Sequence, residues 1–199
     1  MVGVLLIAAS VIAGLANRST PTTYAGTVWD PAPAKPDFTL TDTSGHPYDF
    51  REQTKGKVTL LYFGYTNCPD VCPITMATIA GALNNLPGSA VTVVFVTTDP
   101  VRDTPARIRQ WLDGYDTDFV GLTGTPAQLA AAQRAAGVTV AQADAPDKKG
   151  NYAVGHAASV LVYTGDGRQH LSYPFGTTQG DWQHDIPLVL ANKAWNTGS

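Results

Sequence analysis

The two cysteines of this 199-residue chain, Cys68 and Cys72, lie in the stretch CPDVCP and are the side chains best suited to chemistry. Three residues separate them, so both sulfur atoms can face the same way across about one helical turn. Such a pair could form a stabilising disulfide, act as a redox couple or bind one metal ion. A bridge across so short a loop would restrain the unfolded chain little, and redox couples usually have two intervening residues. The spacing therefore disfavours a purely structural disulfide and leaves metal binding and redox chemistry open.

Both cysteines are expected at the start of a helix. An apolar pattern with helical spacing follows them at residues 74–86, and Pro69 or Pro73 suits a first helical turn. Free amide groups and the helix dipole stabilise a thiolate at that position. We therefore expect the pKa values of both thiols to lie below their ordinary range.

Two thiolates do not complete most metal sites, so a histidine is the next ligand to seek. His156 begins the apolar run HAASVLVYT after a loop, from which its imidazole could reach the cysteine-bearing helix. His46 falls in an early turn, His170 on a later strand and His184 in the last helix. Position alone does not distinguish His156 from a structural or surface histidine. Met76 is a further candidate ligand, but a methionine on an apolar helix face is more often part of the core.

The elements that must position these residues alternate between strands and helices. Continuous apolar runs rich in β-branched residues predict buried strands, and apolar residues at helical spacing predict helices. This order predicts an α/β fold with a mixed sheet flanked by helices and with an N-terminal hairpin, and chemistry in such sheets lies beyond the carboxyl ends of strands. In chain order we expect a hairpin (37–50), a strand (57–66), a helix (74–86), a strand (90–99), a helix (103–115), a strand (119–124), a helix (125–137), a hairpin (156–176) and a helix (181–195) disturbed near Pro187.

The chain is expected to have three parts. Residues 1–16 are almost wholly apolar and uncharged, and a membrane span needs roughly 17–25 such residues, so we expect a membrane anchor or a signal segment. Residues 17–35 are rich in Thr, Pro, Ala and Gly and predict a linker, and residues 36–199 predict the folded domain. This layout is typical of a protein on the extracytoplasmic face of a membrane, either anchored or released by signal cleavage. The net charge of −3 and the scattered Lys and Arg residues disfavour a nucleic-acid partner, and we expect a monomer.

A resemblance to a known family adds to this interpretation. The strings FGYTNCPDVCPITM and VTTDPVRDTP, with a histidine before the late hairpin, resemble the Sco/SenC family from about residue 36 to the last helix. These are thioredoxin-like copper proteins that help to assemble the copper centre of cytochrome c oxidase. The resemblance implies a thioredoxin-like domain in which Cys68, Cys72 and His156 bind copper. Two thiolates and an imidazole suit copper(I), and a further ligand would accommodate copper(II).

The sequence departs from the family around the histidine. The family commonly has an acidic residue directly before it and a hydroxyl residue after it, whereas here Gly155 precedes His156 and Ala157 follows. An acidic neighbour can orient an imidazole ligand or tune its basicity, so its loss bears on affinity more than on ligand identity. Asp144 and Asp147, in the loop upstream, are the residues that could replace it.

The resemblance implies a metallochaperone rather than an enzyme. Its partners would be the copper-bearing subunit of cytochrome c oxidase or other copper chaperones. The main alternative is a thiol–disulfide oxidoreductase that uses Cys68 and Cys72 as a redox-active pair to reduce the cysteines of the copper acceptor, without needing His156. A thiol peroxidase is disfavoured because Thr66 stands two residues before Cys68 rather than three. A copper-responsive signalling module would bind the metal without transferring it, and only a partner assay distinguishes that class from a chaperone.

Overall fold

The computed structural model describes residues 23–84, 86 and 90–196. Within these residues no helix is both long enough and apolar enough to cross a membrane. The predicted apolar segment, residues 1–16, lies outside the described residues, as does the first part of the predicted linker.

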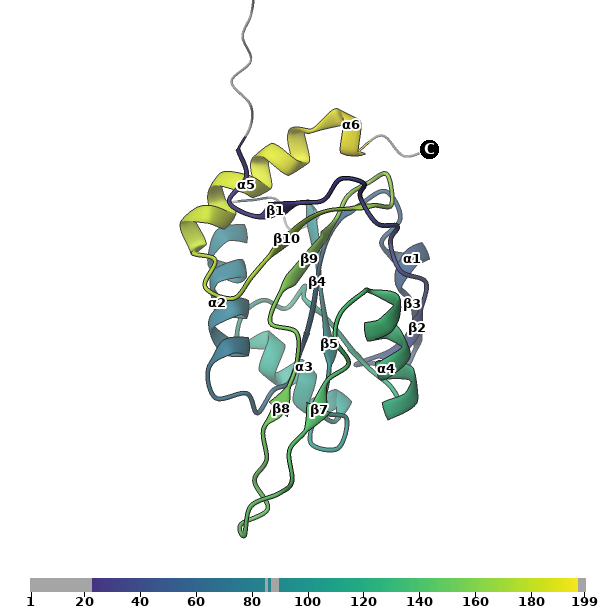
Figure 1. Cartoon of the computed structure of the whole chain (residues 1–199), viewed down its shortest axis with the longest axis vertical. Helices are drawn as coiled ribbons and strands as arrows, with labels where there is room; N and C mark the ends of the chain where they lie inside the picture. Colours follow the sequence, from purple (N-terminus) through teal and green to yellow (C-terminus); the bar gives the residue numbers. More distant parts are fainter. Residues whose placement is uncertain (1–22, 85, 87–89, 197–199) are drawn as a thin grey trace, which may run out of the picture.

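A mixed sheet of eight strands forms the centre of the domain, in the order β1-β10-β9-β4-β5-β6-β2-β3 (Figure 1). β4, β5 and β6 are parallel to one another, whereas β9 runs antiparallel to β4. The carboxyl ends of β4 and β5 and the amino end of β9 therefore lie at the same end of the sheet, and the predicted mixed α/β fold is confirmed. The strands of this sheet are β1 (Thr27–Val28), β2 (Thr39–Asp42), β3 (Pro47–Asp49), β4 (Val58–Gly64), β5 (Val91–Thr97), β6 (Val120–Thr123), β9 (Val160–Tyr163) and β10 (Gln169–Tyr173).

Helices cover both faces of the central strand β4. Every residue of β4 is buried, as its continuous apolar run predicts. Leu60 and Tyr62 join one core cluster with residues of α2, α3 and α5, whereas Leu61 and Phe63 join a second cluster with residues of α1 and α4. This division follows from the alternation of side chains along a strand. The helices of the described residues are α1 (Phe50–Gln53), α2 (Val71–Leu83), α3 (Pro105–Asp113), α4 (Pro126–Ala135), α5 (Gln179–Ala191) and α6 (Lys193–Asn196).

The helices begin in two different ways. The side chains of Thr104 and Thr125 accept a hydrogen bond from the first turn of α3 and of α4, and a proline follows each of them. At the start of α2, Asp70 makes no such capping bond, so the amide groups of that first turn are left for other acceptors. The last predicted helix differs from expectation, because α5 continues through Pro187 and ends only before Asn192.

Part of the stretch expected to be a linker, residues 25–28, contacts the folded domain. β1 pairs with β10 at the edge of the main sheet. The N–H groups of Ala25 and Gly26 donate hydrogen bonds to the buried carboxylate of Asp185, at 2.7 and 3.4 Å. The outer side of strand β10 and the buried carboxylate of Asp185 both need hydrogen-bond partners, and the backbone of this stretch supplies them. The composition of the stretch, rich in Thr and Pro, gives no sign of these contacts.

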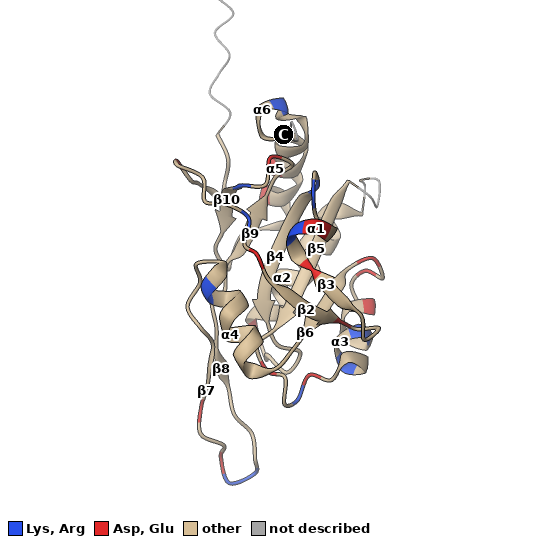
Figure 2. Cartoon of the chain, turned by 90° about the vertical axis from the view of Figure 1, so that its right-hand side faces the viewer, with Lys and Arg blue, Asp and Glu red and all other residues tan. Residues whose placement is uncertain are grey.

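A long hairpin, which we call the arm (residues 142–155), projects from the end of the sheet where β4 stops (Figure 1). Its strands are β7 (Gln142–Ala143) and β8 (Val154–Gly155), which pair antiparallel in a separate two-stranded sheet. Its tip carries charges of both signs (Figure 2). The sequence predicted only a loop here, because strands of two residues show no periodicity.

Candidate metal centre

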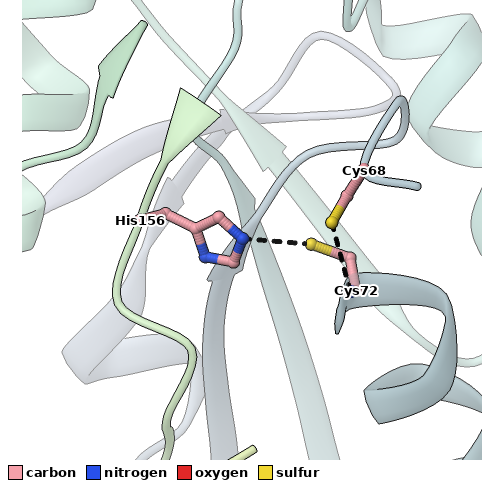
Figure 3. A group of neighbouring side chains, drawn as sticks. All are labelled: Cys68, Cys72 and His156. Atoms are coloured by element: carbon pink, nitrogen blue, oxygen red, sulfur yellow. Dashed lines mark hydrogen bonds between the residues drawn. The ribbon is translucent and has the colours of Figure 1, made fainter. Parts of the chain in front are cut away.

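Cys68, Cys72 and His156 come together at the end of the sheet where β4 stops (Figure 3). The turn after β4 carries Cys68, the first turn of α2 carries Cys72, and His156 directly follows β8. The two Sγ atoms and one imidazole nitrogen all lie within 4.8 Å of one another, and both cysteines are free thiols. The structure thus brings together the three residues that the sequence and the resemblance singled out.

Cys68 accepts hydrogen bonds from the start of α2. The N–H group of Cys72 donates to Cys68 Sγ at 3.4 Å. Burial raises the pKa of Cys68, but hydrogen bonds from the backbone amides of Asp70, Cys72 and Val71 lower it. Together the hydrogen bonds outweigh burial, so the pKa lies below its ordinary value. The expectation of a lowered pKa is confirmed for Cys68, which is also the more exposed of the two thiols.

Cys72 behaves differently from Cys68. Its side chain is fully buried against the core between β4 and α2. Burial raises the pKa of Cys72 to about 12, which outweighs the hydrogen bonds it receives. Our expectation of two lowered pKa values was therefore wrong for Cys72, because desolvation of a thiolate opposes the effect of the helix N-terminus.

His156 presents one ring nitrogen to Cys72. Its Nε2 atom lies 3.4 Å from Cys72 Sγ, and its Nδ1 atom lies 3.1 Å from the carbonyl oxygen of Ala157. A carbonyl can only accept, so Nδ1 carries the proton and Nε2 has the free lone pair that a metal requires. The rings of Tyr62 and Tyr65 meet the imidazole edge-on, with centroids 6.0 and 5.6 Å away.

The surroundings favour the neutral form of this imidazole, which lies outside the main sheet. Burial lowers the pKa of His156, although the hydrogen bond to the Ala157 carbonyl acts in the opposite direction. We expected His156 to open the late strand, but β9 begins only at Val160. His156 instead occupies the irregular segment between the arm and β9.

The spacing of the three ligand atoms suits one metal ion. Two ligand atoms that are each about 2.0–2.3 Å from an ion, at trigonal angles, lie roughly 3.5–4 Å apart. The distance of 3.4 Å between Cys72 Sγ and His156 Nε2 is close to that value. Two sulfurs and one nitrogen suit copper(I), whereas zinc in a structural site usually takes four protein ligands.

The remaining histidines lie elsewhere, with other partners. The side chain of His46 is 77% exposed near Asp42, and His184 pairs with Asp185. His170 pairs with Asp166 and stacks on Trp195. Met76 is fully buried in the core cluster, which agrees with its interpretation as a core residue.

Comparisons with known proteins agree with this geometry. The profile of the family described as SCO1/SenC matches residues 28–191 of the chain. The chain belongs to the SCO1/SenC family. A protein of Stutzerimonas stutzeri is 32% identical over 165 residues, which are 80% of this chain and 78% of that protein.

Solved SCO1/SenC structures have the same fold. The copper-bound structure of ScoI from Bradyrhizobium japonicum is 34% identical, with a TM-score of 0.69, and the match covers 79% of this chain and 99% of that chain. The solution structure of apo Sco1 from Thermus thermophilus is 32% identical, with a TM-score of 0.70, and the match covers 85% of this chain and 95% of that chain. The predicted family and thioredoxin-like fold are thereby confirmed.

In this SCO1/SenC chain a backbone carbonyl, not an acidic side chain, is the hydrogen-bond partner of the Nδ1 atom of His156. The carboxylate of Asp147 accepts hydrogen bonds from Lys149 and Asn151 at the exposed tip of the arm. Asp144 is also exposed and lies on the arm, so neither acid serves as the partner of His156. The Ala157 carbonyl takes that place, and it fixes the tautomer without adding a negative charge.

Sequence analysis missed the close packing around Cys72. A Cβ atom added to Gly64 would lie 2.8 Å from Cys72 Sγ, closer than such atoms can approach. The available signal was a glycine among large buried residues at the end of a strand, which often marks a close approach of another group. The Ala157 carbonyl left no signal, since every residue has one.

Proposed function

We propose that this SCO1/SenC chain is a metallochaperone that binds one copper ion through Cys68, Cys72 and His156 and delivers it to the copper centre of cytochrome c oxidase. The observation that carries the proposal is the convergence of the three ligand atoms within 4.8 Å. The copper bound to the Bradyrhizobium japonicum relative supports the choice of metal. The donor set supports copper(I) as the transferred form.

Delivery proceeds, in this proposal, by exchange of ligands on the ion. Cys72 is buried and Cys68 is partly exposed, so an acceptor reaches the copper from the Cys68 side. A thiolate or thioether of the acceptor binds the three-coordinate ion and then replaces one of its protein ligands. Each cysteine sulfur that leaves the ion takes up a proton or stays as a thiolate according to its pKa. Both cysteines must be reduced for loading, which links copper binding to redox state.

The proposed acceptor is the copper-bearing subunit of cytochrome c oxidase or another copper chaperone. We place the protein on the extracytoplasmic face of a membrane, held by the apolar residues 1–16 or exported after their removal. The uncharged, apolar composition of that segment supports this location.

Copper(I) retention under a competing chelator tests the ligand set. The full chain is reduced anaerobically, loaded with copper(I), and compared with His156→Ala and with His46→Ala, whose histidine is 77% exposed and lies outside the site. We expect one tightly bound copper in the wild type, roughly 10- to 100-fold weaker binding in His156→Ala, and no change in His46→Ala. Equal retention in all three proteins would remove His156 from the site and overturn the proposal.

A second function, reduction of a partner's disulfide, is favoured by the unequal thiols. The Cys68 thiolate attacks one sulfur of the partner's disulfide, which forms a mixed disulfide and releases the other sulfur as a thiolate. Cys72 gives up its proton, which the released partner thiolate takes up, and attacks Cys68 Sγ, so that a Cys68–Cys72 disulfide forms and the partner leaves with two reduced sulfurs. The lowered pKa and greater exposure of Cys68 suit the attacking role, and burial of Cys72 suits the resolving role.

The two functions differ in their need for the histidine. His156→Ala could reduce a disulfide at the wild-type rate and yet fail to retain copper. That result would show that disulfide reduction needs only the two cysteines, whereas copper binding also needs His156. Transfer of copper to an acceptor domain by the wild type, but not by His156→Ala, would support the chaperone.

A further inference from the structure

His156 lies on a segment that needs an external support. The arm contributes only the two-residue strand β8 before it, and an irregular segment separates it from β9. The cysteines, by contrast, are held by β4 and by the first turn of α2. The distance between imidazole and sulfur therefore depends on how the base of the arm is fixed to the rest of the domain.

Arg102 and Tyr152 form one such attachment. The guanidinium of Arg102 lies over the ring of Tyr152, 3.6 Å from its centroid, and its Nη1 donates a hydrogen bond to the Tyr152 carbonyl at 3.0 Å. Arg102 Nη2 is buried and has no hydrogen-bond partner among the described residues. The ring and the carbonyl thus hold one side of the guanidinium, although its hydrogen bonds are incomplete. A lysine could not reproduce this flat, stacked contact.

Asp99 ties both residues to the loop after β5. Its carboxylate forms an ion pair with Arg102 Nε and accepts a hydrogen bond from the Tyr152 hydroxyl at 2.8 Å. The same loop is joined to β4 by the N–H group of Thr98, which donates to the Gly64 carbonyl at 2.7 Å. Arg102 therefore connects the arm, four residues before the histidine, to the end of the strand that leads to the cysteines.

A second contact leads from Arg102 to the imidazole through Tyr65. The guanidinium lies 5.6 Å from the centroid of the Tyr65 ring, which meets the His156 ring edge-on. The Tyr65 hydroxyl also accepts a hydrogen bond from the N–H group of Val154 at 3.4 Å. Arg102 thus lies against two aromatic rings, that of Tyr152 on the arm and that of Tyr65, which contacts the imidazole of His156.

We propose that Arg102 is a positioning residue that, through its stack on Tyr152, holds His156 at copper-binding distance from Cys68 and Cys72. The inference rests on the proposed ligand set. It assigns to the motif VTTDPVRDTP a role in the metal centre, although none of its residues belongs to the ligand cluster.

A double-mutant cycle in the full chain tests the proposal. Arg102→Met is made in the wild-type and His156→Ala backgrounds, and copper(I) affinity is measured by chelator competition. We expect roughly tenfold weaker binding from Arg102→Met in the wild type and less than about twofold further loss in His156→Ala, because the arginine acts through the histidine. The control is Arg109→Met, which also loses an ion pair and a carbonyl contact, to Asp113 and Phe119, and is expected to retain wild-type affinity.

Amide hydrogen exchange of the metal-free protein gives a second measurement. Arg102→Met is expected to increase exchange in residues 152–157 and to leave the amides of α2 protected, since only the histidine segment is released. Tyr152→Leu removes the other half of the stack and is expected to give the same exchange pattern. This second variant keeps the proposal testable if Arg102→Met does not fold.

The outcomes separate this inference from the proposed function. A loss in His156→Ala without a loss in Arg102→Met would overturn the role of Arg102 alone. An equal loss from Arg102→Met in both backgrounds would also overturn it, because the arginine would then act on the cysteines or on the whole fold. Unchanged affinity in His156→Ala would overturn the ligand set and the positioning role together.

Discussion

The hydroxyl group of Tyr62 lies 3.5 Å from the Sγ atom of Cys72 and donates a hydrogen bond to it from within the core. The pKa of Tyr62 is raised, first by burial and then by the neighbouring sulfur of Cys72, so the phenol keeps its proton. A protonated donor at this place stabilises a thiolate more than a thiol. The buried sulfur therefore has one partner that favours the form needed to bind metal.

Tyr62→Phe should weaken copper binding without damaging the fold. Loss of the hydrogen bond raises the pKa of Cys72 further and costs about 1 kcal/mol, or roughly fivefold in copper(I) affinity at neutral pH. The matched control is Tyr163→Phe, whose buried hydroxyl bonds to Gln169 on another part of the sheet. Chelator competition on both variants checks the prediction, and an equal change in both would refute a specific role for Tyr62.

Gly155→Asp should restore an acidic neighbour for His156 at little cost in stability. The nearest atom to an added Cβ is the carbonyl oxygen of Gln142 at 3.8 Å, and Gly155 does not have a positive φ angle. A carboxylate beside the imidazole should raise the pKa of His156 and, above that pKa, strengthen copper binding. NMR titration of the His156 ring in Gly155→Asp and in the uncharged Gly155→Asn measures the effect. Identical titrations in the two variants would contradict it.

Copper(I) affinity should increase with pH, because binding displaces protons. The pKa of Cys72 is about 12, so this thiol releases about one proton on binding throughout the neutral range. The pKa of Cys68 is lowered, so Cys68 releases a further proton only below its own pKa. A plot of log affinity against pH should therefore have a slope of about one above the pKa of Cys68 and approach about two below it, as long as the pH stays above the lowered pKa of His156. An affinity that does not vary with pH would show that Cys72 is not a ligand or is already ionised.

Gly64→Ala should displace the sulfur of Cys72. The added methyl group would lie 2.8 Å from Cys72 Sγ and 2.8 Å from the ring of Tyr62. We expect a loss of roughly 1–3 kcal/mol in the free energy of unfolding and at least about tenfold in copper(I) affinity. Gly121→Ala is a matched control, because its methyl group would lie 2.5 Å from Ile108 away from the metal site. That variant should lose stability and retain copper affinity, and a similar loss of affinity in both would contradict the prediction.

The sequence predicted the elements whose patterns are long enough to be periodic. The apolar runs that became β4 and β5, and the helical spacing that became α3 and α4, were identified correctly because each reflects a local property of the chain. The positions of Cys68 and Cys72 followed from their spacing and the strand before them. His156 depended on the resemblance, since position alone did not distinguish it from other histidines.

The features that sequence analysis missed depend on contacts between distant segments. Arg102 contacts Tyr152, which is 50 positions away in the sequence. Nothing in the sequence around either residue indicates this contact. The raised pKa of Cys72 comes from burial by the completed fold, whereas the helix start that suggested a lowered value is local. β1 and the arm are too short to show alternation, and each is fixed by a partner strand.

The antiparallel pairing of β9 with β4 has a consequence for biosynthesis. Cys72 and His156 are 84 positions apart, and a nascent chain emerges with its N-terminus first. The dithiol therefore exists, without its imidazole and without strand β9 beside it, while the later part of the chain is still being made. During that interval oxidants have access to a cysteine pair that the finished fold partly covers. Completion of the polypeptide both supplies the last proposed donor for the metal and encloses the sulfur of Cys72.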